Sequence, residues 1–326
     1  MTDNGHRHRF YDLDDVRIHA VEQGEGPAVL LVHGYPETSY SWRHQLPVIA
    51  DAGYKAIAID VRGYGQSSCP ESIEDYRIVR MVADNVRLAE ALGIDDLVIV
   101  GHDWGAPIAW SSALLRPDLF SALALLSVPY TPPSVERPTK AVAELFGQDG
   151  EFYMTYFQEP GRADAEAEED VRAWITGFYY GGAAGAPPEA TRFAVVPKGQ
   201  KMKDLLVQPE TEMSWLPAAD LDVYVAEFER TGLTGGLNRY RNLDRDWEDL
   251  AAFRGRPVTV PTVFIGGDAD GPTIWGAQAI ARFPKTLPDL RGSHILERCG
   301  HWIQQEKPDE VNRLLLDFLA EVRPVA

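Results

Sequence analysis

Gly101-His102-Asp103-Trp104-Gly105 decides the fold, because this segment joins a short apolar run to a helix through two closely spaced glycines. The run before it, Leu97–Val100, is typical of a parallel strand buried on both faces, and Pro107–Leu115 after it has helical spacing. A sharp turn between the two lifts the central side chain clear of the sheet and points a helix N-terminus at it. The pattern is typical of a nucleophile elbow, with Asp103 where serine usually stands.

Strand-like and helix-like segments alternate on both sides of this turn through the first third of the chain. Short apolar runs indicate central parallel strands, and the period-two pattern of Val16–Val21 predicts a half-buried edge strand. A helix is predicted at Ile78–Leu92. The remaining predicted strands are Ala28–Val32, Lys55–Ile59, Leu97–Val100 and Ala122–Leu126. This alternation predicts an α/β fold with a mostly parallel sheet flanked by helices.

The alternation stops near Tyr130 and returns only at Val260–Ile265. The segment between is rich in Glu, Asp and aromatic residues and has helix-like stretches at 163–178 and 220–230. We therefore predict a mainly helical cap at residues 131–258, inserted into a core of residues 1–130 and 259–326. The rest of the core is predicted as a helix at 275–282, a strand at 293–296 and a closing helix at 308–322.

Composition and charge exclude several classes of partner. The 326 residues are 45% hydrophobic and carry a net charge of −18, which disfavours nucleic acid and anionic lipid surfaces. No apolar run approaches the ~20 residues that a membrane span needs. The polar segment 1–8 leads into no apolar region, so we expect no secretory signal and a cytoplasmic location. Cys69 and Cys299 show no metal-ligand spacing, so neither a metal nor a cofactor is expected. Whether the chain forms a homodimer is left open.

A carboxylate at the elbow constrains the chemistry. Aspartate has a reference pKa of ~3.9, so it is ionised at neutral pH and needs no base to act as a nucleophile. Attack by Asp103 on an ester or amide would give only a labile anhydride, whereas attack on an sp³ carbon gives an alkyl ester. Water can cleave that ester at its carbonyl, while a serine alkylated at the same place would be a stable ether. The residue type therefore indicates alkyl transfer, with epoxides and alkyl halides as the natural electrophiles.

Activation of that water needs a histidine held in one tautomer by an acid, and elbow enzymes place nucleophile, acid and histidine in this order along the chain. His301 follows the last predicted strand and supplies the histidine. Asp270 supplies the acid because it stands further beyond the end of its strand than Asp268, which is the competing candidate. His102 is assigned a structural role, because side chains adjacent on the elbow point apart.

The loop His33-Gly34-Tyr35-Pro36 follows a predicted strand at the place where an oxyanion hole is completed. The backbone N–H groups of Tyr35 and Trp104 are expected to donate to a carboxyl oxygen of Asp103 when water makes its carbon tetrahedral. Losing one such donor costs ~3–4 kcal/mol of barrier, so the hole is a substantial contribution. The sequence leaves open whether the peptide bond before Pro36 is cis.

These motifs together resemble the soluble epoxide hydrolase family of the α/β-hydrolase fold, and the resemblance covers about residues 10–319. Many sister enzymes share the core motifs, which here include Arg62–Ser68 and Cys299–Trp302. The cap motifs are more specific: Tyr153–Gly161, which reads Tyr-Met-Thr-Tyr-Phe-Gln-Glu-Pro-Gly, and Tyr240–Asn242 are similar to epoxide hydrolases in particular. The resemblance implies a capped α/β-hydrolase that converts a small apolar epoxide into a vicinal diol.

The resemblance also implies that Tyr153 and Tyr240 lie over the nucleophile. An opening epoxide develops alkoxide character on its oxygen, and phenols with a pKa near ~10 keep the proton needed to hydrogen-bond to it. Tyr156, three residues after Tyr153, is the tyrosine most easily mistaken for it, because both could face one side of a helix. The residues expected to line the substrate pocket are Trp104, Phe157 and Trp302.

Two other functions remain as alternatives. A haloalkane or haloacetate dehalogenase would share the elbow, the acid, the histidine and the cap. Trp104 matches the halide-binding Trp of the haloalkane branch, but Tyr35 stands where that branch has an Asn. A noncatalytic ligand-binding protein of the same fold would be expected to have a broken triad, and Asp103, Asp270 and His301 are all present.

Overall fold

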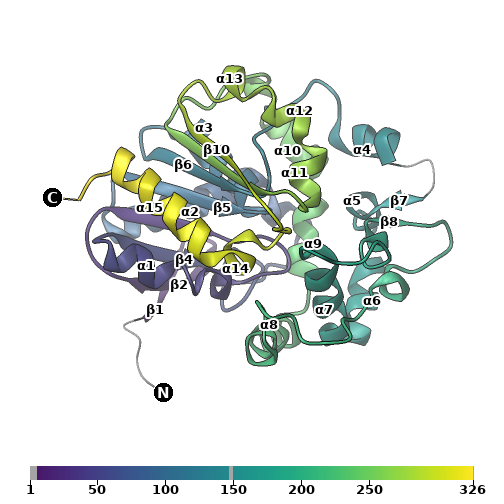
Figure 1. The fold of residues 1–326 in the computed structure, drawn as a ribbon. Coiled ribbons are helices and arrows are strands. Elements are labelled where there is room, and N and C mark those ends of the chain that lie inside the picture. The colour runs from purple at the N-terminus through teal and green to yellow at the C-terminus, as the bar shows by residue number, and fades with distance from the viewer. Residues whose placement is uncertain (1–5, 147–149, 326) are drawn as a thin grey trace.

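The computed structural model describes residues 6–146 and 150–325 and contains an eight-stranded sheet in the order β1-β2-β4-β3-β5-β6-β9-β10 (Figure 1). The first two pairings of the sheet, β1 with β2 and β2 with β4, are antiparallel, and the others are parallel. The strands are β1 Arg7–Leu13, β2 Val16–Gln23, β3 Ala28–Val32, β4 Lys55–Ile59, β5 Leu97–His102, β6 Phe120–Leu126, β9 Thr262–Gly267 and β10 Leu290–Leu296. The predicted α/β class and mostly parallel sheet are confirmed.

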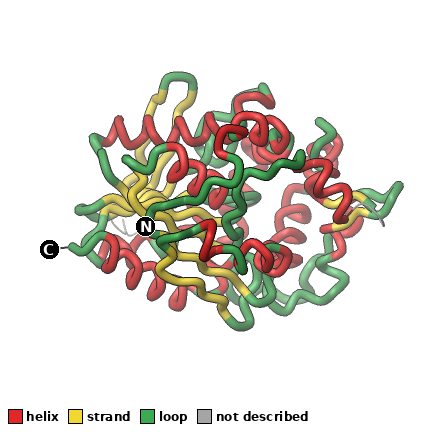
Figure 2. The backbone as a smooth tube through the Cα atoms, turned by 90° about the horizontal axis from the view of Figure 1, so that it is seen from above, coloured by secondary structure: helices red, strands yellow, loops and turns green. Residues whose placement is uncertain are grey.

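The central strands are apolar throughout because helices cover both faces of the sheet. In β3, Leu30 packs into one core with α2 (Ile78–Leu92) and α3 (Gly105–Leu115), while Leu31 packs into another with α1 (Leu46–Asp51) and α15 (Pro308–Val322). Viewed from above, the strands lie between these groups of helices (Figure 2). Because side chains alternate between the two faces of a strand, each central strand contributes to both cores, and neither of its faces is polar.

The strand order opens a crevice at the carboxyl ends of β3 and β5. Strand β3 lies between β4 and β5, so the connections that leave β3 and β5 run to opposite sides. Such a reversal of strand order is where open α/β sheets bind ligands. The loop at 33–36 and the turn at 101–105 follow these two strands, so the topology brings both to this crevice.

The chain between β6 and β9 forms a group of helices on the side of the sheet away from the termini (Figure 1). The elements are α4 Pro138–Phe146, β7 Glu151–Phe152, α5 Tyr153–Tyr156, α6 Arg162–Glu169, α7 Val171–Gly182, β8 Val195–Val196, α8 Ala218–Thr231, α9 Thr234–Tyr240 and α10 Leu243–Asp249. Strands β7 and β8 pair as a small antiparallel sheet. The helix expected at 163–178 is two helices, because Asp170 accepts a hydrogen bond from the Ala173 N–H and starts α7. The cap boundaries at 131 and 258 stay a prediction.

Two expectations about the core are wrong. Strand β2 is not an edge strand, because β1 pairs along it and takes the outer position. The β1 sequence is polar and mostly exposed, which hides it from a search for apolar alternation but suits an edge that must avoid other chains. The helix expected at 275–282 is instead three short helices, α11 Gly271–Trp275, α12 Ala277–Ile280 and α13 Phe283–Thr286, followed after β10 by α14 Ile303–Glu306.

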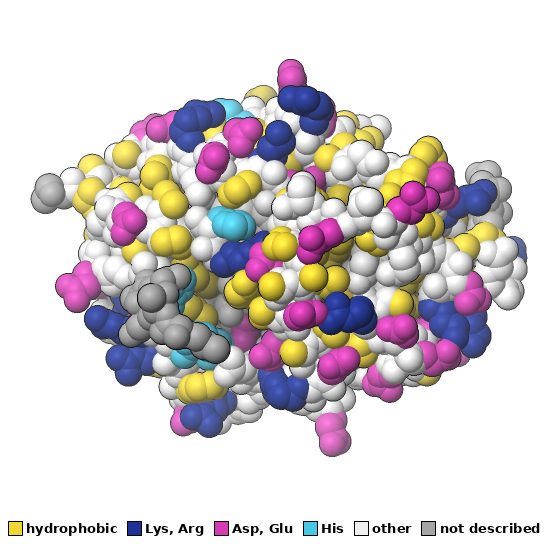
Figure 3. Space-filling model, turned by 60° about the horizontal axis from the view of Figure 1, so that its bottom comes forward, with side chains coloured by type: hydrophobic (Ala, Val, Ile, Leu, Met, Phe, Trp, Pro, Cys, Tyr) yellow, Lys and Arg dark blue, Asp and Glu magenta, His cyan; other side chains and the backbone are white. Residues whose placement is uncertain are grey.

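Charged side chains of both signs are interspersed over the face seen in Figure 3. None of the helices in the described part of the chain is long and apolar enough to cross a membrane. The expectation of no secretory signal concerns residues 1–8, of which residues 1–5 lie outside the described residues.

Candidate active site

The elbow holds Asp103 in a backbone conformation that its neighbours enforce. Asp103 has a φ of 49°, in the left-handed region that side chains other than glycine rarely occupy. A Cβ added to Gly101 would lie 2.1 Å from the Gly105 carbonyl oxygen, and one added to Gly105 would lie 1.9 Å from the Val32 oxygen. Only glycine therefore lets the turn pack this closely against β3, and the turn leaves Asp103 buried in the crevice, with 9% of its surface exposed.

The loop after β3 supplies a backbone donor to this carboxylate. The Tyr35 N–H donates to Asp103 Oδ1 over 2.7 Å. A Cβ on Gly34 would lie 2.3 Å from the same oxygen, so the loop can reach Asp103 only with glycine there. The Tyr35–Pro36 peptide bond is cis. Among the described residues the Trp104 amide makes no hydrogen bond to Asp103, so its part as the second donor stays a prediction.

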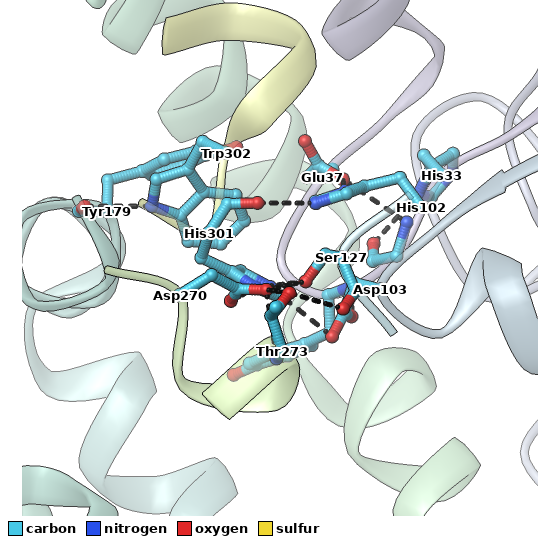
Figure 4. Close-up of polar contacts among 12 residues, drawn as sticks. His33, Glu37, His102, Asp103, Ser127, Tyr179, Asp270, Thr273, His301 and Trp302 are labelled. Atoms are coloured by element: carbon cyan, nitrogen blue, oxygen red, sulfur yellow. Dashed lines mark hydrogen bonds and ion pairs between the residues drawn. The ribbon is translucent and has the colours of Figure 1, made fainter. Parts of the chain in front are cut away.

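His301 lies between two carboxylates (Figure 4). Its Nε2 is 3.4 Å from Asp103 Oδ2, and its Nδ1 is 2.9 Å from Asp270 Oδ1. Asp270 is fully buried and starts α11. The competing candidate, Asp268, is exposed and accepts a hydrogen bond from the Cys299 N–H at 3.2 Å. The structure thus brings Asp103, His301 and Asp270 together and leaves Asp268 outside this group.

Two hydroxyl groups that the sequence did not single out hold Asp270 in place. Ser127 Oγ donates to Asp270 Oδ2 over 2.8 Å and lies 2.9 Å from His301 Nδ1, and Thr273 Oγ1 is 2.6 Å from Asp270 Oδ2. Ser127 directly follows β6 and has a φ of 70°. The sequence signal for Ser127 was its position at the end of the strand that pairs with β5, but serine is too common at strand ends for this position to identify it as a site residue.

The protonation states of Asp103 and His301 depend on each other. Burial alone would raise the pKa of Asp103, but the hydrogen bond and charge of His301 outweigh this and lower it. Burial likewise lowers the pKa of His301, but Asp103 and Asp270 outweigh this effect and raise it to about 10. The resting site therefore holds an ionised Asp103 beside a protonated His301 at neutral pH.

His102 and Glu37 form a second buried pair behind the nucleophile (Figure 4). His102 Nδ1 is 2.7 Å from Glu37 Oε2, and its Nε2 donates to the backbone carbonyl of His301 over 2.8 Å. Glu37 Oε1 accepts hydrogen bonds from Gln304 and Gln305, both at 2.9 Å. His102 thus has structural contacts, as predicted, and Glu37, which the sequence reasoning missed, links the loop at 33–36 to the chain after His301.

Asp103 and His301 open into a cavity of about 330 Å³ whose wall also includes Tyr153, Tyr240 and Trp302. Trp104 and Phe157 are not among its lining residues. Their rings instead pack against Tyr240, each with a centroid separation of 5.0 Å. Of the three predicted pocket aromatics, the structure places Trp302 in the wall and the other two behind it.

Tyr153 begins α5 and Tyr240 ends α9, and their ring centroids are 5.9 Å apart. Burial raises the pKa of each phenol above its ordinary value, and the nearby charge of Asp103 raises it further, so both keep their protons. Within residues 6–146 and 150–325, neither hydroxyl has a hydrogen-bond partner. Tyr156 differs, because its hydroxyl donates to Glu166 and it does not line the cavity.

The described residues contain no group of three or more His, Cys, Asp or Glu side chains that could hold a metal ion. The groups that meet at the cavity are a carboxylate, a protonated histidine backed by an acid, a backbone donor and two phenols. Such a set can attack a carbon, donate to a leaving oxygen and activate water.

Comparison with known families first gives the class. The profile of the α/β hydrolase fold matches residues 27–183, in agreement with the strand order and the elbow. Epoxide hydrolase B of Mycobacterium tuberculosis is 42% identical over 97% of this chain and 99% of its own length. Epoxide hydrolase A of the same species is 43% identical over 95% of this chain and 96% of its own. The chain belongs to the epoxide hydrolase family of the α/β-hydrolase fold.

Solved structures agree with this assignment. An epoxide hydrolase from an endophytic Streptomyces is 57% identical, with a TM-score of 0.95 over 98% of this chain and 96% of that one. Epoxide hydrolase A from Mycobacterium thermoresistibile is 45% identical, with a TM-score of 0.90 over 96% of this chain and 98% of that one. The likeness covers the helices between β6 and β9 as well as the sheet.

Proposed function

We propose that this chain hydrolyses a small apolar epoxide to a vicinal diol through an alkyl ester on Asp103. One observation carries the proposal: a buried carboxylate and two phenol hydroxyls without a partner among the described residues line the same cavity. A carboxylate and an acid on opposite sides of a substrate are what opening a three-membered ether requires. In this proposal the triad belongs to the core, residues 1–130 and 259–326. The two tyrosines belong to the cap, residues 131–258.

The first step is ring opening. A carboxylate oxygen of Asp103 attacks one ring carbon, a new C–O ester bond forms, and the ring C–O bond breaks. Tyr153 and Tyr240 donate hydrogen bonds to the oxygen as it becomes an alkoxide, and one phenol transfers its proton to it. Their raised pKa keeps them protonated until this charge develops. The Tyr35 N–H fixes Asp103 Oδ1 during the attack.

The second step is hydrolysis of the ester. Esterification removes the charge of Asp103, one of the two charges that raise the pKa of His301. The pKa of His301 therefore falls, and the imidazolium gives up the proton that restores the phenol deprotonated in ring opening. The neutral ring can then take a proton from water while Asp270 holds its Nδ1 side. Hydroxide adds to the Asp103 carboxyl carbon, and the oxyanion accepts hydrogen bonds from the Tyr35 N–H and, as proposed, the Trp104 N–H. On collapse the ester C–O bond breaks and the leaving alkoxide takes the proton of the new carboxylic acid, which releases the diol and leaves Asp103 ionised beside a protonated His301.

The dehalogenase alternative needs donors for a leaving halide. Trp104 would be one of them, but it packs against Tyr240 and Arg239 and is not among the residues that line the cavity. The groups presented at the cavity, Tyr153 and Tyr240, suit an oxygen that must gain a proton. The geometry therefore favours the epoxide over the alkyl halide.

Two parallel assays test the proposal. Diol formation from styrene oxide and halide release from chloro- and bromoalkanes are measured on the same preparation, with Asp103→Ala as the control for both. We expect diol from the native chain, none from the control, and no halide from either. Halide without diol would overturn the choice of substrate.

A further inference from the structure

Trp104 connects the nucleophile turn to the helices between β6 and β9. It directly follows Asp103, stands at the N-cap of α3 and is 8% exposed. Its ring meets the ring of Tyr240 with the centroids 5.0 Å apart and the planes at 87°. This contact therefore joins the residue beside the nucleophile to one of the two proposed acids.

Arg239, the residue before Tyr240 on α9, contacts the same indole. Its guanidinium carbon lies 4.7 Å from the centre of the Trp104 ring, which is a cation–π geometry. Arg239 is 2% exposed, so salt and solvent screen this attraction little. Two consecutive residues of α9 therefore pack against Trp104, one through its charge and the other through its ring.

Polar contacts fix the orientation of this guanidinium. Its Nη1 donates to the carbonyl of Tyr76, two residues before α2, over 2.6 Å. Its Nη2 donates to Asp246 of α10, and Asp246 Oδ1 accepts the N–H of Ile78, the first residue of α2, over 2.7 Å. Because the guanidinium fork is planar and rigid, these partners also fix the plane that it presents to Trp104.

The position of Arg239 is not explained by substrate contact or by stability. Neither Arg239 nor Trp104 is among the lining residues of the cavity. A buried ion pair is often no more stabilising than apolar residues of the same volume. The hydrogen bond from Tyr240 to an opening epoxide, however, weakens steeply when distance or angle departs from the optimum. A rigid contact behind the Tyr240 ring therefore matters for ring opening.

We propose that Arg239 is a positioning residue for ring opening: through Trp104 it holds Tyr240 where its hydroxyl can donate to the oxygen of the substrate. The inference rests on the proposed function, because it takes Tyr240 to be one of the two acids. It goes beyond that function by assigning a role to a buried charge that lies outside both the cavity and the triad.

A double-mutant cycle tests whether Arg239 acts through Tyr240. Arg239→Met, Tyr240→Phe and their combination are each made with Asp246→Asn, so that no carboxylate stays buried without its partner, and are compared with Asp246→Asn alone. The asparagine oxygen can still accept the Ile78 N–H. Single turnovers of styrene oxide give the rates of ester formation and ester decay. The Kd of 2-phenylacetamide is also measured, because its carbonyl oxygen can accept from the phenols but it has no ring to open.

Arg62→Met combined with Asp84→Asn is the matched control. Arg62 is 1% exposed, pairs with Asp84 through two N–H groups and donates to the Asp75 carbonyl over 3.0 Å, but it does not line the cavity. Arg239→Lys is a milder variant, because an ammonium group can lie over the indole but lacks the fork. Circular dichroism confirms that each variant is folded.

We expect Arg239→Met to slow ester formation about tenfold and to raise the Kd of 2-phenylacetamide by a similar factor, and Arg239→Lys to cause about a threefold loss. Ester decay, which does not use Tyr240, should change by less than about twofold, and so should every quantity in the control. In the Tyr240→Phe background, Arg239→Met should cause less than about a twofold further loss.

Two results would overturn the positioning role. One is an Arg239→Met variant with unchanged ester formation and amide binding. The other is a loss in Arg239→Met that is equally large with and without the Tyr240 hydroxyl, which would mean that Arg239 does not act through Tyr240. If amide binding shows the coupling while the native chain opens no epoxide, the positioning role is retained and the proposed function is contradicted.

Discussion

Replacing His301 by glutamine should separate the two proposed steps. Glutamine cannot take a proton from water, so the variant loses the general base and ester hydrolysis should slow by about a hundredfold to ten-thousandfold. Ring opening does not use His301 as a base and should continue. The variant should therefore stop as the alkyl ester on Asp103, provided that Asp103 remains ionised without its partner.

The contact between His301 and Asp103 shows why the pH of this experiment matters. At the observed 3.4 Å, the attraction between His301 and Asp103 is at most about 5 kcal/mol with an effective dielectric constant of about 20. Its loss would raise the pKa of Asp103, which His301 holds below the ordinary value in the native site. Raising the pH favours the ionised, attacking form of Asp103, so the variant is assayed at about pH 9.

The assay is intact-protein mass spectrometry after mixing with styrene oxide. His301→Gln should gain the mass of one substrate molecule and keep it, and Asp103→Ala should gain none. His294→Gln is the matched control: this histidine lies on β10 outside the cavity, so the variant should turn over like the native chain. A His301→Gln variant that neither gains mass nor turns over would refute the division of labour between nucleophile and base.

Tyr153→Phe should slow ring opening by roughly tenfold to a hundredfold, as expected for the loss of one hydrogen bond to a developing charge. The double variant with Tyr240→Phe should slow ring opening much more. The rate of ester formation in a single turnover measures both effects. Ester hydrolysis should slow as the pH falls through the pKa that His301 has in the ester, because the protonated ring cannot act as a base. This pKa lies below the value of about 10 that His301 has in the free site. The rate of ring opening should stay constant over the same range, and the rates of ester decay and ester formation measured against pH check both expectations. Asp84→Asn should destabilise the fold by about 3 kcal/mol in urea unfolding, because Asp84 pairs through two oxygens, at 2.7 and 2.6 Å, with the fully buried Arg62.

The sequence was sufficient where local pattern decides structure. The strands Ala28–Val32 and Lys55–Ile59 and the helices Ile78–Leu92 and Pro308–Val322 have the predicted bounds, because apolar runs and helical spacing are local signals. The positions of Asp103 and His301 also followed from local motifs and chain order. By contrast, β1 is polar and exposed, so only its pairing with β2 makes it a strand.

The parts of the site that sequence could not supply depend on contacts between distant segments. Glu37 is 65 positions from His102, and Ser127 is 143 positions from Asp270, so no spacing rule connects them. By contrast, the sequence did favour Asp270 over Asp268, and the structure places Asp270 at the start of α11 with its Oδ1 2.9 Å from His301 Nδ1. Tyr153 and Tyr240 were selected by resemblance to a family, and the structure adds that both line the cavity with Asp103.

The central claim is that the substrate becomes an ester of Asp103 before water enters. A single turnover in ¹⁸O-labelled water, with enzyme in excess over styrene oxide, tests it most directly. Because hydroxide attacks the carboxyl carbon, the label should appear in Asp103, located by peptide mass spectrometry, and the first diol should be unlabelled. A labelled first diol with an unlabelled Asp103 would mean that water attacks the epoxide itself, and would contradict the account.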